Sequence, residues 1–388
     1  MRKLPWEYAV RNLARSPLRL VLTVGSATLV VLLVIVSAGF VRGMRRSLRA
    51  TGQAHNVILL GAGSEESIER SEIARGVETH LAASVDGLKS TLGQAHISPE
   101  VHMQVGLTTS PNGGTALPGS ARGYTAPAFL VHPKVRLVRG RAPRQGANEI
   151  MAGRLAAARM GLPAGRLDVG QVIYFDRRPW KVVGVFEAGR TVIESEIWIP
   201  LDDLLIAAKR DSLSCVVATL DAAEFEDVDL FARQRLDLEL VAMRETDYYD
   251  GLSAFYRPIE VVAMATAALV ALAGLFGGLN TMYAAFAARV REYGALQTLG
   301  FPRRAIVLSA VQESVLASCI GGLVASALGA ALLDGLAVRF SLGAFGLIVD
   351  SPVLVVGLLA GLILGGIGAL PPAWRCLRMP IPTALKAM

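Results

Sequence analysis

The sequence predicts an α-helical membrane protein with four transmembrane helices and a large mixed α/β extracytoplasmic domain inserted between the first and the second of them. Of its 388 residues, 53% are hydrophobic and only 18% are charged, whereas a soluble domain carries about 25% charged residues. The apolar residues gather in four blocks, each as long as the about 20 residues that a spanning helix needs. Residues 42–257, between the first two blocks, have the composition of an ordinary soluble fold.

The order of these blocks gives the domain organisation. The first block is longer than the about 7–15 residues of a signal-peptide core, so we expect a retained span. In chain order we expect an interfacial amphipathic helix at 1–17, transmembrane helices at 18–41, 258–288, 305–337 and 352–372, the extracytoplasmic domain at 42–257, a cytoplasmic helix at 289–304, a short external loop at 338–351 and a cytoplasmic tail at 373–388.

The N-terminal stretch predicts a helix that lies on the membrane surface. Trp6, Ala9, Val10 and Leu13 follow the i, i+3, i+4, i+7 spacing of one apolar face. A helix with one apolar and one basic face binds in the plane of the lipid headgroups. Pro17 ends the pattern.

Both termini are predicted to be cytoplasmic. Lys and Arg gather in the N-terminal stretch, in 289–304 and in the tail, with only Arg339 between the last two spans. Short loops rich in Lys and Arg stay on the cytoplasmic side. Four arginines at 42–49 disagree, but long domains are translocated largely regardless of charge.

The large domain is predicted to mix strands and helices. Runs rich in β-branched and aromatic residues predict strands at 56–60, 135–138, 171–175, 180–186, 196–200 and 214–220. Helical patterns lie at 65–93, 149–161 and 222–236. The stretch 108–123, rich in Gly, Pro and Ser, predicts an exposed loop.

No catalytic constellation is found in the sequence. A Walker A loop ends in Gly-Lys-Ser/Thr, so that backbone amides and the lysine hold phosphates, and this chain has no Gly-Lys dipeptide. It also lacks a G-x-S-x-G elbow and a Cys/His pair placed for nucleophilic attack. We therefore expect no enzyme activity, no catalytic residue and no cofactor bound by this chain.

Neither a metal nor a nucleic acid is expected as a ligand. Cys215, Cys319 and Cys376 lie far apart, and His96 and His102 do not belong to an H-E-x-x-H pattern. The net charge of +7 comes with arginines that flank the apolar blocks. Lipid headgroups explain that placement better than a nucleic acid does.

Small residues recur every four positions in the last three predicted spans. Such spacing lets helices approach closely in lipid, either within one subunit or across a dimer interface. The predicted helix-packing positions are Gly274, Gly278, Gly321, Gly322, Gly357, Gly361 and Gly365.

The segment RVREYGALQTLGFPRR (289–304) separates two apolar blocks. Its glycine at 294 costs about 1 kcal/mol in an exposed helix, which makes sense where another surface comes close, and Gly300 suits the position after a helix C-terminus. The pattern predicts a short cytoplasmic helix that docks a partner protein. The expected docking residues are Arg291, Glu292, Tyr293, Gly294, Leu296, Leu299 and Gly300.

Glu313 is the one carboxylate within the first part of the third span. It could form an ion or proton site, or it could pair with a neighbouring arginine at the inner interface. Because the spans are poor in other polar groups, the second interpretation is favoured. An ion-coupled carrier is therefore the least favoured class.

The motif REYGALQTLGFPRRAI (291–306) resembles the R-E-[I/F/Y]-G-x-L-x-x-L-G-x-x-[R/K]-x-x-[I/V] signature of the MacB/FtsX-like permeases of ABC transporters. Residues 312–329, 370–385 and 12–23 resemble that family's following span, its C-terminal ending and its entry to the first span. The order of one span, a large outer domain and three spans also matches. The resemblance covers nearly the whole chain.

This resemblance implies a permease subunit without a fused ATPase. Its coupling helix, between spans two and three, would bind a separate ABC-type ATP-binding subunit that holds ATP and Mg, and would pass on its motion by mechanotransmission. Further implied partners are a second permease (homo- or heterodimer), the lipid of a bacterial inner membrane and, as an open case, a periplasmic adaptor. The implied task is export or extraction of a hydrophobic, peptide or lipoprotein cargo. The alternative is regulation, without transport, of a cell-envelope enzyme such as a peptidoglycan hydrolase.

Overall fold

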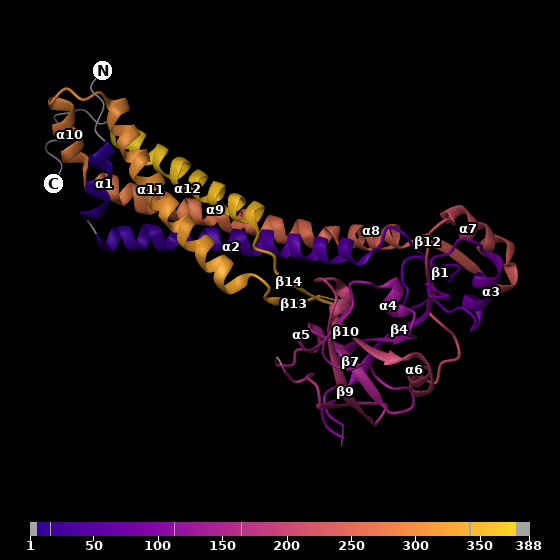
Figure 1. Cartoon of the computed structure of the whole chain (residues 1–388). Helices are drawn as coiled ribbons and strands as arrows, with labels where there is room; N and C mark the ends of the chain where they lie inside the picture. Colours follow the sequence, from indigo (N-terminus) through magenta and orange to yellow (C-terminus); the bar gives the residue numbers. More distant parts are fainter. Residues whose placement is uncertain (1–5, 16, 112, 164, 341–342, 378–388) are drawn as a thin grey trace. The chain divides into compact units, whose positions relative to one another are not determined.

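The computed structural model describes residues 6–15, 17–111, 113–163, 165–340 and 343–377 (Figure 1). The chain forms two compact units. The helical unit contains Met1–Arg42, Pro258–Leu336 and Leu347–Met388, and the α/β unit contains Gly43–Arg257 and Ala337–Gly346.

Four helices of the described chain are long and apolar enough to cross a membrane. The α/β domain is inserted between the first and the second of them, which confirms the predicted fold class. The helices outside the inserted domain are α1 (Trp6–Ala14), α2 (Pro17–Thr51), α9 (Arg257–Ala287), α10 (Val290–Thr298), α11 (Arg303–Leu328), the π-helical turn Gly329–Leu333 that continues α11, and α12 (Ser351–Leu377).

The first long helix does not end near residue 41, where its apolar run stops. α2 continues to Thr51, and Met44, Ser47, Leu48 and Thr51 are all buried. Their i, i+3, i+4, i+7 spacing puts them on one face of the helix. The arginines between them have good helix propensity and occupy the remaining faces, so a charged stretch extends the span instead of ending it.

Other boundaries also differ from the predicted ones, and α12 continues to Leu377 instead of ending at 372, so the first residues of the predicted tail are helical. The helix of the third span ends at Leu333 rather than 337. The segment predicted as a short external loop contains the antiparallel hairpin β13 (Ala337–Arg339) and β14 (Ala344–Gly346). The ends of the predicted N-terminal helix and tail, residues 1–5 and 378–388, lie outside the described residues.

The α/β unit is built on a ten-stranded mixed sheet. Its strand order is β12-β1-β11-β4-β5-β10-β7-β9-β6, with β8 paired to β9. The strands are β1 (Asn56–Gly61), β4 (Ile97–Leu107), β5 (Leu117–Tyr124), β6 (Arg136–Gly140), β7 (Glu149–Gly153), β8 (Val172–Phe175), β9 (Arg178–Glu187), β10 (Glu196–Pro200), β11 (Cys215–Thr219) and β12 (Leu240–Arg244), with a separate hairpin of β2 (Ser90–Thr91) and β3 (Gln94–Ala95). Two pairs, β5 with β10 and β7 with β9, are parallel.

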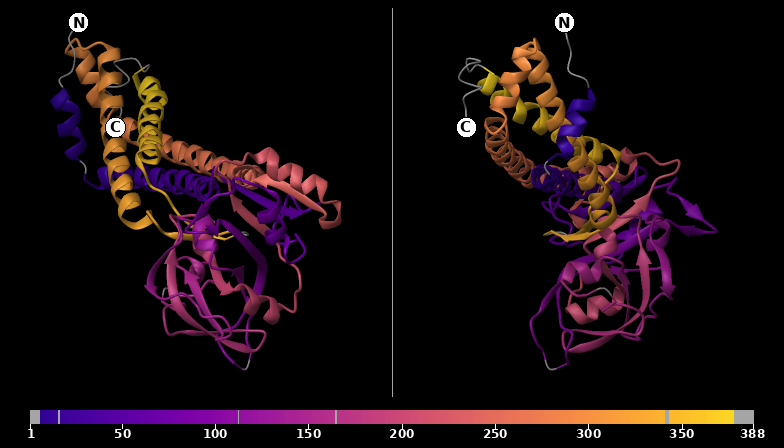
Figure 2. Two further views of the ribbon diagram at one scale, coloured as in Figure 1. Left: turned by 45° about the vertical axis from the view of Figure 1, so that its right-hand side comes forward. Right: turned by 90° about the vertical axis from the view of Figure 1, so that its left-hand side faces the viewer.

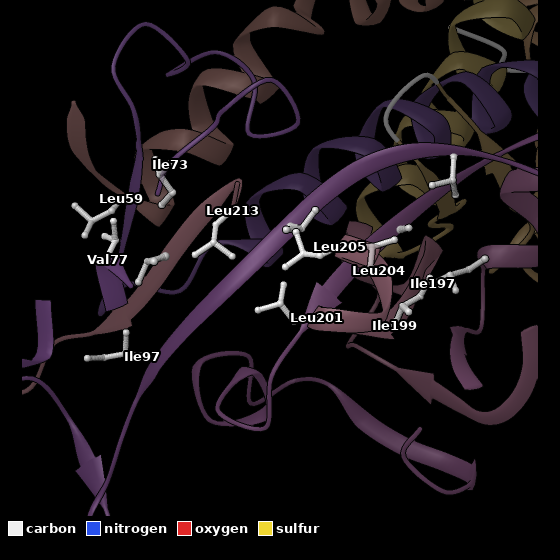
Figure 3. Packing of buried hydrophobic residues seen from close by; sticks show 14 of the residues in the cluster. Leu59, Ile73, Val77, Ile97, Ile197, Ile199, Leu201, Leu204, Leu205 and Leu213 are labelled. Atoms are coloured by element: carbon white, nitrogen blue, oxygen red, sulfur yellow. The ribbon is translucent and has the colours of Figure 1, made fainter. Parts of the chain in front are cut away.

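Short helices cover this sheet. They are α3 (Val77–Ser84), α4 (Ala128–Val131), α5 (Ala156–Met160), α6 (Leu201–Ala208), α7 (Phe225–Gln234) and α8 (Glu245–Phe255), with 3-10 turns at Val192–Ser195 and Leu236–Leu238. Aliphatic side chains from strands and helices form one buried cluster along the sheet, in which Leu59 lies beside Val77 in one part and Ile197 lies near Leu204 in another (Figure 3).

Three predictions for this domain were wrong. The helix expected at 149–161 begins with β7, because Ile150 and Met151 are fully buried between β9 and β10. The second half of the loop expected at 108–123 is β5. Only Val77–Ser84 of the helix expected at 65–93 is helical.

Candidate functional site

The predicted coupling helix is α10, which follows α9 after a two-residue turn and precedes α11 (Figure 1). Arg289, at its N-cap, is buried and bonds two carboxylates. Its Nε lies 3.1 Å from Glu292 Oε2 and its Nη1 lies 3.1 Å from Glu313 Oε2. Its guanidinium also lies 5.2 Å from the ring centre of Tyr293. One arginine thus ties the helix start to the body of α11.

The end of α10 is closed by a Schellman motif. Phe301 N donates to Leu296 O, and Gly300 N donates to Gln297 O, the paired 6→1 and 5→2 bonds of that motif. Gly300 has φ +88°, a left-handed conformation that glycine adopts without steric cost. Pro302 then serves as the N-cap of α11, so the chain stops one helix and starts the next within a few residues.

The structure divides the predicted docking residues between two sides of α10. Tyr293 and Gly294 are buried, and Tyr293 packs with Phe286 and Ile306. Burial raises the pKa of Tyr293. Leu296 is half-buried in the same cluster. These apolar residues therefore pack against the chain itself, and their role in docking a partner stays a prediction.

The other side of α10 is exposed. Arg291, Glu292 and Gly300 are exposed, and Leu299 is 64% exposed. The first turn of α11 extends this surface with Arg303 and Arg304, which are exposed as well. We call this surface, Arg291, Glu292, Leu299, Gly300, Arg303 and Arg304, the coupling surface.

Most of the predicted helix-packing glycines lie where two helices of the helical unit approach closely. A Cβ added at Gly274, Gly321, Gly357 or Gly365 would lie less than 3.0 Å from an atom of a neighbouring helix. At Gly322 and Gly361 this distance would be 3.3 Å. In the first three of these contacts the neighbour is α2, and α11 and α12 also run side by side (Figure 2). A Cβ at Gly278 would meet no described atom within 4 Å.

A second candidate site lies inside the α/β unit, where the sequence predicted none. It is a cluster of buried polar side chains from β1, β4, β5, β10, the end of α4 and the start of α8. We call it the buried charge cluster, and its members are Asn56, Glu100, His102, Arg122, His132, Glu196 and Glu245.

Arg122 is the centre of this cluster. Its Nε and Nη2 form a two-point pair with Glu196, at 2.7 and 2.8 Å, and its Nη1 lies 2.5 Å from Glu100 Oε2. His132 Nε2 lies 2.9 Å from the other oxygen of Glu100. The side chain of Arg122 is only 2% exposed. The guanidinium therefore joins three neighbouring strands by charge-assisted hydrogen bonds, which are stronger than neutral ones.

Glu245, the first residue of α8, connects the cluster to the end of α2. Its Oε2 accepts hydrogen bonds of 2.9 Å from the backbone N–H of Gln53 and from Asn56 Nδ2. A Cβ at Gly52 would lie 3.0 Å from Thr246 Cα, so a larger residue here would press against the backbone of α8. We call the segment 50–56 together with the first turn of α8 the joint.

The joint is also held from the other side. Lys134 Nζ donates to Ala50 O, and the backbone N–H of Val192 donates to Thr51 Oγ1 at 3.2 Å. Arg49 and Asp250 add an exposed ion pair of 3.5 Å between α2 and α8. The last turn of α2 is thus fixed to α8 and to two loops of the α/β unit.

The carboxylates of the cluster differ in their pKa values. Burial alone would raise the pKa of Glu100, but His132 and Arg122 hold it well below 4.5. The pKa of Glu196 is also lowered, because Arg122 outweighs the effect of burial. For Glu245, burial outweighs His132 and the two hydrogen bonds and raises the pKa.

Glu100, His102 and Cys215 offer three metal-ligand atoms within 4.8 Å of one another. Both oxygens of Glu100, however, already accept hydrogen bonds from Arg122 and the two histidines. Burial also raises the pKa of the Cys215 thiol well above its usual value, whereas a metal needs the thiolate. The arrangement is that of an ion-pair cluster with its own cation.

Fold and sites together define a multi-pass membrane protein whose helical unit carries an α/β domain between its first two spans. The chain belongs to the MacB/FtsX-like family of ABC transporter permeases. Residues 20–234 match the MacB-like periplasmic core domain, and residues 264–381 match the FtsX-like permease C-terminal family. These are families of permease domains rather than ATPases.

Several known proteins are similar in sequence. The chain is 29% identical over 249 residues to the pyoverdine export ATP-binding/permease protein PvdT of Pseudomonas syringae pv. tomato, covering 59% of this chain and 36% of PvdT. It is 21% identical over 230 residues to the uncharacterized ABC transporter permease YknZ of Bacillus subtilis, covering 56% and 57%. It is 31% identical over 144 residues to the macrolide export ATP-binding/permease protein MacB of Nitrobacter winogradskyi, covering 35% of this chain and 22% of MacB. The chain thus spans less than two thirds of each relative.

Two solved structures are similar to the α/β unit. The periplasmic region of MacB from Actinobacillus actinomycetemcomitans has a TM-score of 0.39 and 13% identity, covering 53% of this chain and 95% of that one. The extracellular domain of the noncanonic ABC-type transporter YknZ from Gram-positive bacteria has a TM-score of 0.37 and 14% identity, covering 48% and 99%.

Proposed function

We propose that this chain is the permease subunit of an ABC transporter and passes the ATP-driven motion of a separate ATP-binding subunit from α10 to its α/β unit. The observation that supports this most is helix continuity. α2 has 35 residues, a length of about 52 Å at about 1.5 Å per residue, and runs from the helical unit into the α/β unit. On the return path only Tyr256 separates α8 from α9.

The joint gives these helices a defined point of action. Gln53, Asn56 and Glu245 tie the end of α2 to the start of α8, and Glu245 adjoins His132 of the buried charge cluster at 4.0 Å. Asn56 of β1 also accepts a hydrogen bond of 2.8 Å from Thr219 Oγ1 of β11, so a displacement of either helix would reach these two strands through hydrogen bonds between buried groups. A flexible linker in this place would absorb the displacement instead of passing it to the strands.

The proposed cargo is hydrophobic, a peptide or a lipoprotein, and it would be exported or extracted on the outer face of the membrane. The names of PvdT and MacB describe export, which favours transport over the regulatory alternative. Glu313 forms an ion pair with Arg289 at the start of α10, which supports coupling rather than an ion path.

We place the chain in a bacterial inner membrane with both termini in the cytoplasm, because the coupling surface has to meet a cytoplasmic ATP-binding subunit. That subunit would hold ATP and Mg. A permease dimer, of two copies or of two related chains, would offer two coupling surfaces. A periplasmic adaptor is a further proposed partner.

The experiment changes the exposed part of α10 only. In Arg291→Glu with Leu299→Asp, we expect the ATP-binding subunit that co-purifies with the native chain to be lost and the ATPase rate of the assembly in lipid nanodiscs to fall about tenfold or more, because charge and apolar area are removed from the interface. Leu236→Asp, at a leucine of the α/β unit that is 82% exposed, serves as the control. Unchanged co-purification and ATPase rate in the double variant would contradict the proposal.

A further inference from the structure

A pocket of about 500 Å³ opens in the α/β unit beside the joint. We call it the exit pocket, because it lies where the chain leaves α2. Gln53 and Asn56, which bond Glu245, form part of its lining. Its volume falls in the range of about 300–1,000 Å³ that is typical of small-molecule sites.

His96 contributes a buried ring to the pocket. The residue is 6% exposed and lines the pocket. Its Nε2 lies 2.7 Å from Thr91 Oγ1, whereas its Nδ1 has no hydrogen-bond partner among the described residues. A buried polar atom costs free energy until it is paired, but Nδ1 is itself shielded from the pocket, so His96 contributes other atoms to the lining.

The charged groups of the lining are one cation and one anion. Lys89 and Asp221 are both exposed, and neither has an ion-pair partner among the described residues. Their backbone segments are hydrogen-bonded to each other, since Lys89 N donates to Thr219 O and Asp221 N donates to Gly87 O. His55 adds an exposed imidazole. Burial and the charge of Lys89 lower the pKa of His96, so this ring is neutral at neutral pH.

The remainder of the lining is mainly apolar and comes from α4 and the turn that follows it. Phe129, Val131 and Pro133 contribute to it. Phe129 is held in place by Trp198 and Tyr124, with ring centres 5.8 and 5.6 Å away. A preformed apolar surface thus lies in the same pocket as two opposite charges.

We propose that the exit pocket binds a small zwitterion with an apolar body, of the class of the apolar α-amino acids. The carboxylate of the ligand faces Lys89, its ammonium group faces Asp221, and its side chain lies against Phe129. A ligand of this kind has no net charge, which matches the sum of Lys89 and Asp221.

The test is calorimetric titration of the full chain in lipid nanodiscs with L-phenylalanine, against empty nanodiscs. We expect saturable binding of one ligand per chain. N-acetyl-L-phenylalanine, which lacks the ammonium charge, and L-phenylalanine amide, which lacks the carboxylate, should each bind about tenfold more weakly, because each loses one charged hydrogen bond. No ATP-binding subunit is present, so the result is independent of the proposed function.

Two exposed substitutions separate the two charges. Lys89→Gln should weaken L-phenylalanine about tenfold and leave the amide unchanged, and Asp221→Asn should weaken L-phenylalanine and leave the N-acetyl form unchanged. Lys181→Gln, at an exposed lysine of β9, should bind all three as the native chain does. Absence of saturable binding, or equal effects of a variant on all three compounds, would overturn the proposal.

Discussion

Arg122 holds together a set of charges that would be costly apart. Glu100 and Glu245 are at most 1% exposed and Glu196 is 8% exposed, and a buried carboxylate without a counter-charge costs several kcal/mol. Arg122 bonds Glu100 and Glu196 directly. Burying a guanidinium rather than apolar side chains at the centre of the sheet fixes the geometry at the cost of desolvation. Glu245 is not bonded by Arg122 and instead accepts the hydrogen bonds of the joint.

The cluster predicts how stability depends on pH. Glu100 and Glu196 have lowered pKa values, so the unfolded chain takes up protons first and their stabilisation is lost as pH falls below 4.5. His102 also has a lowered pKa, through burial and Arg122, and its contribution is lost as pH falls below 6.5. The raised pKa of Glu245 acts in the opposite direction. We expect the melting temperature to fall below pH 6.5 and more steeply below 4.5.

Scanning calorimetry of the full chain between pH 7 and 3 checks this prediction. Glu100→Gln should lower the melting temperature at pH 7 and reduce the steep part below pH 4.5, since the group with the strongly lowered pKa is gone. Glu66→Gln, at an exposed carboxylate of the turn that follows β1, should keep the native profile. A Glu100→Gln profile parallel to that of the native chain below pH 4.5 would contradict the assignment.

The exposed residues of α10 could be found from the sequence, whereas the members of the buried charge cluster could not. Arg291, Glu292 and Leu299 stand out because charges interrupt a long apolar run, and their role in docking stays a prediction. Glu196 stands in a predicted strand, where a charge normally indicates a solvent-facing position, and Glu100 stands in β4, for which no strand was predicted. Alternation of Glu100 and His102 on one face of a strand was the only available sign. Only the pairing of β4 with β5, and of β5 with β10, brings them to Arg122.

At the scale of elements, α2 is the helix around which the helical unit is packed. Gly274 of α9 lies against Val30 of α2, so that a Cβ there would collide with a branched side chain. Gly278, one turn further along α9, has open space at the same position. The two glycines form one G-x-x-x-G pair in the sequence, yet only one of them is needed for contact within the subunit.

This difference gives a matched pair of variants. Gly274→Val should destabilise the chain by about 1–3 kcal/mol, the usual cost of overpacking, because α9 and α2 have to separate. Gly278→Val carries the same change in helix propensity without the collision, and should leave the melting temperature nearly unchanged. Thermal unfolding of both variants in lipid nanodiscs is the measurement. Equal losses would show that Gly278 also faces a helix, as in a dimer.

Long helices were easier to predict than the strands. Each span is set by its own apolar composition, so its position follows from a local property of the sequence. The end of α2 was missed because the arginines beside buried Met44 and Leu48 were interpreted as the charged residues that follow a transmembrane helix. β5 and β7 were missed since their residues become buried only through non-local pairing, which no short window contains.

At the scale of the whole molecule, the proposed function assigns distinct tasks to the two units. The helical unit presents the coupling surface, and the α/β unit holds the buried charge cluster. Two helical connections, α2 and the α8–α9 pair, join these units along the chain. The joint is where both connections meet inside the α/β unit, so it is the place where motion that starts at α10 should be detectable.

Hydrogen exchange at the joint tests this claim most directly. The backbone N–H of Gln53 donates to Glu245, so its exchange rate reports on the joint itself. In the complete assembly in lipid nanodiscs, mass spectrometry should show that exchange in residues 50–56 differs between the nucleotide-free and the vanadate-trapped states, and that the difference disappears in Arg291→Glu with Leu299→Asp. Identical exchange in both states, while the native assembly hydrolyses ATP, would contradict the transmission of motion through this chain.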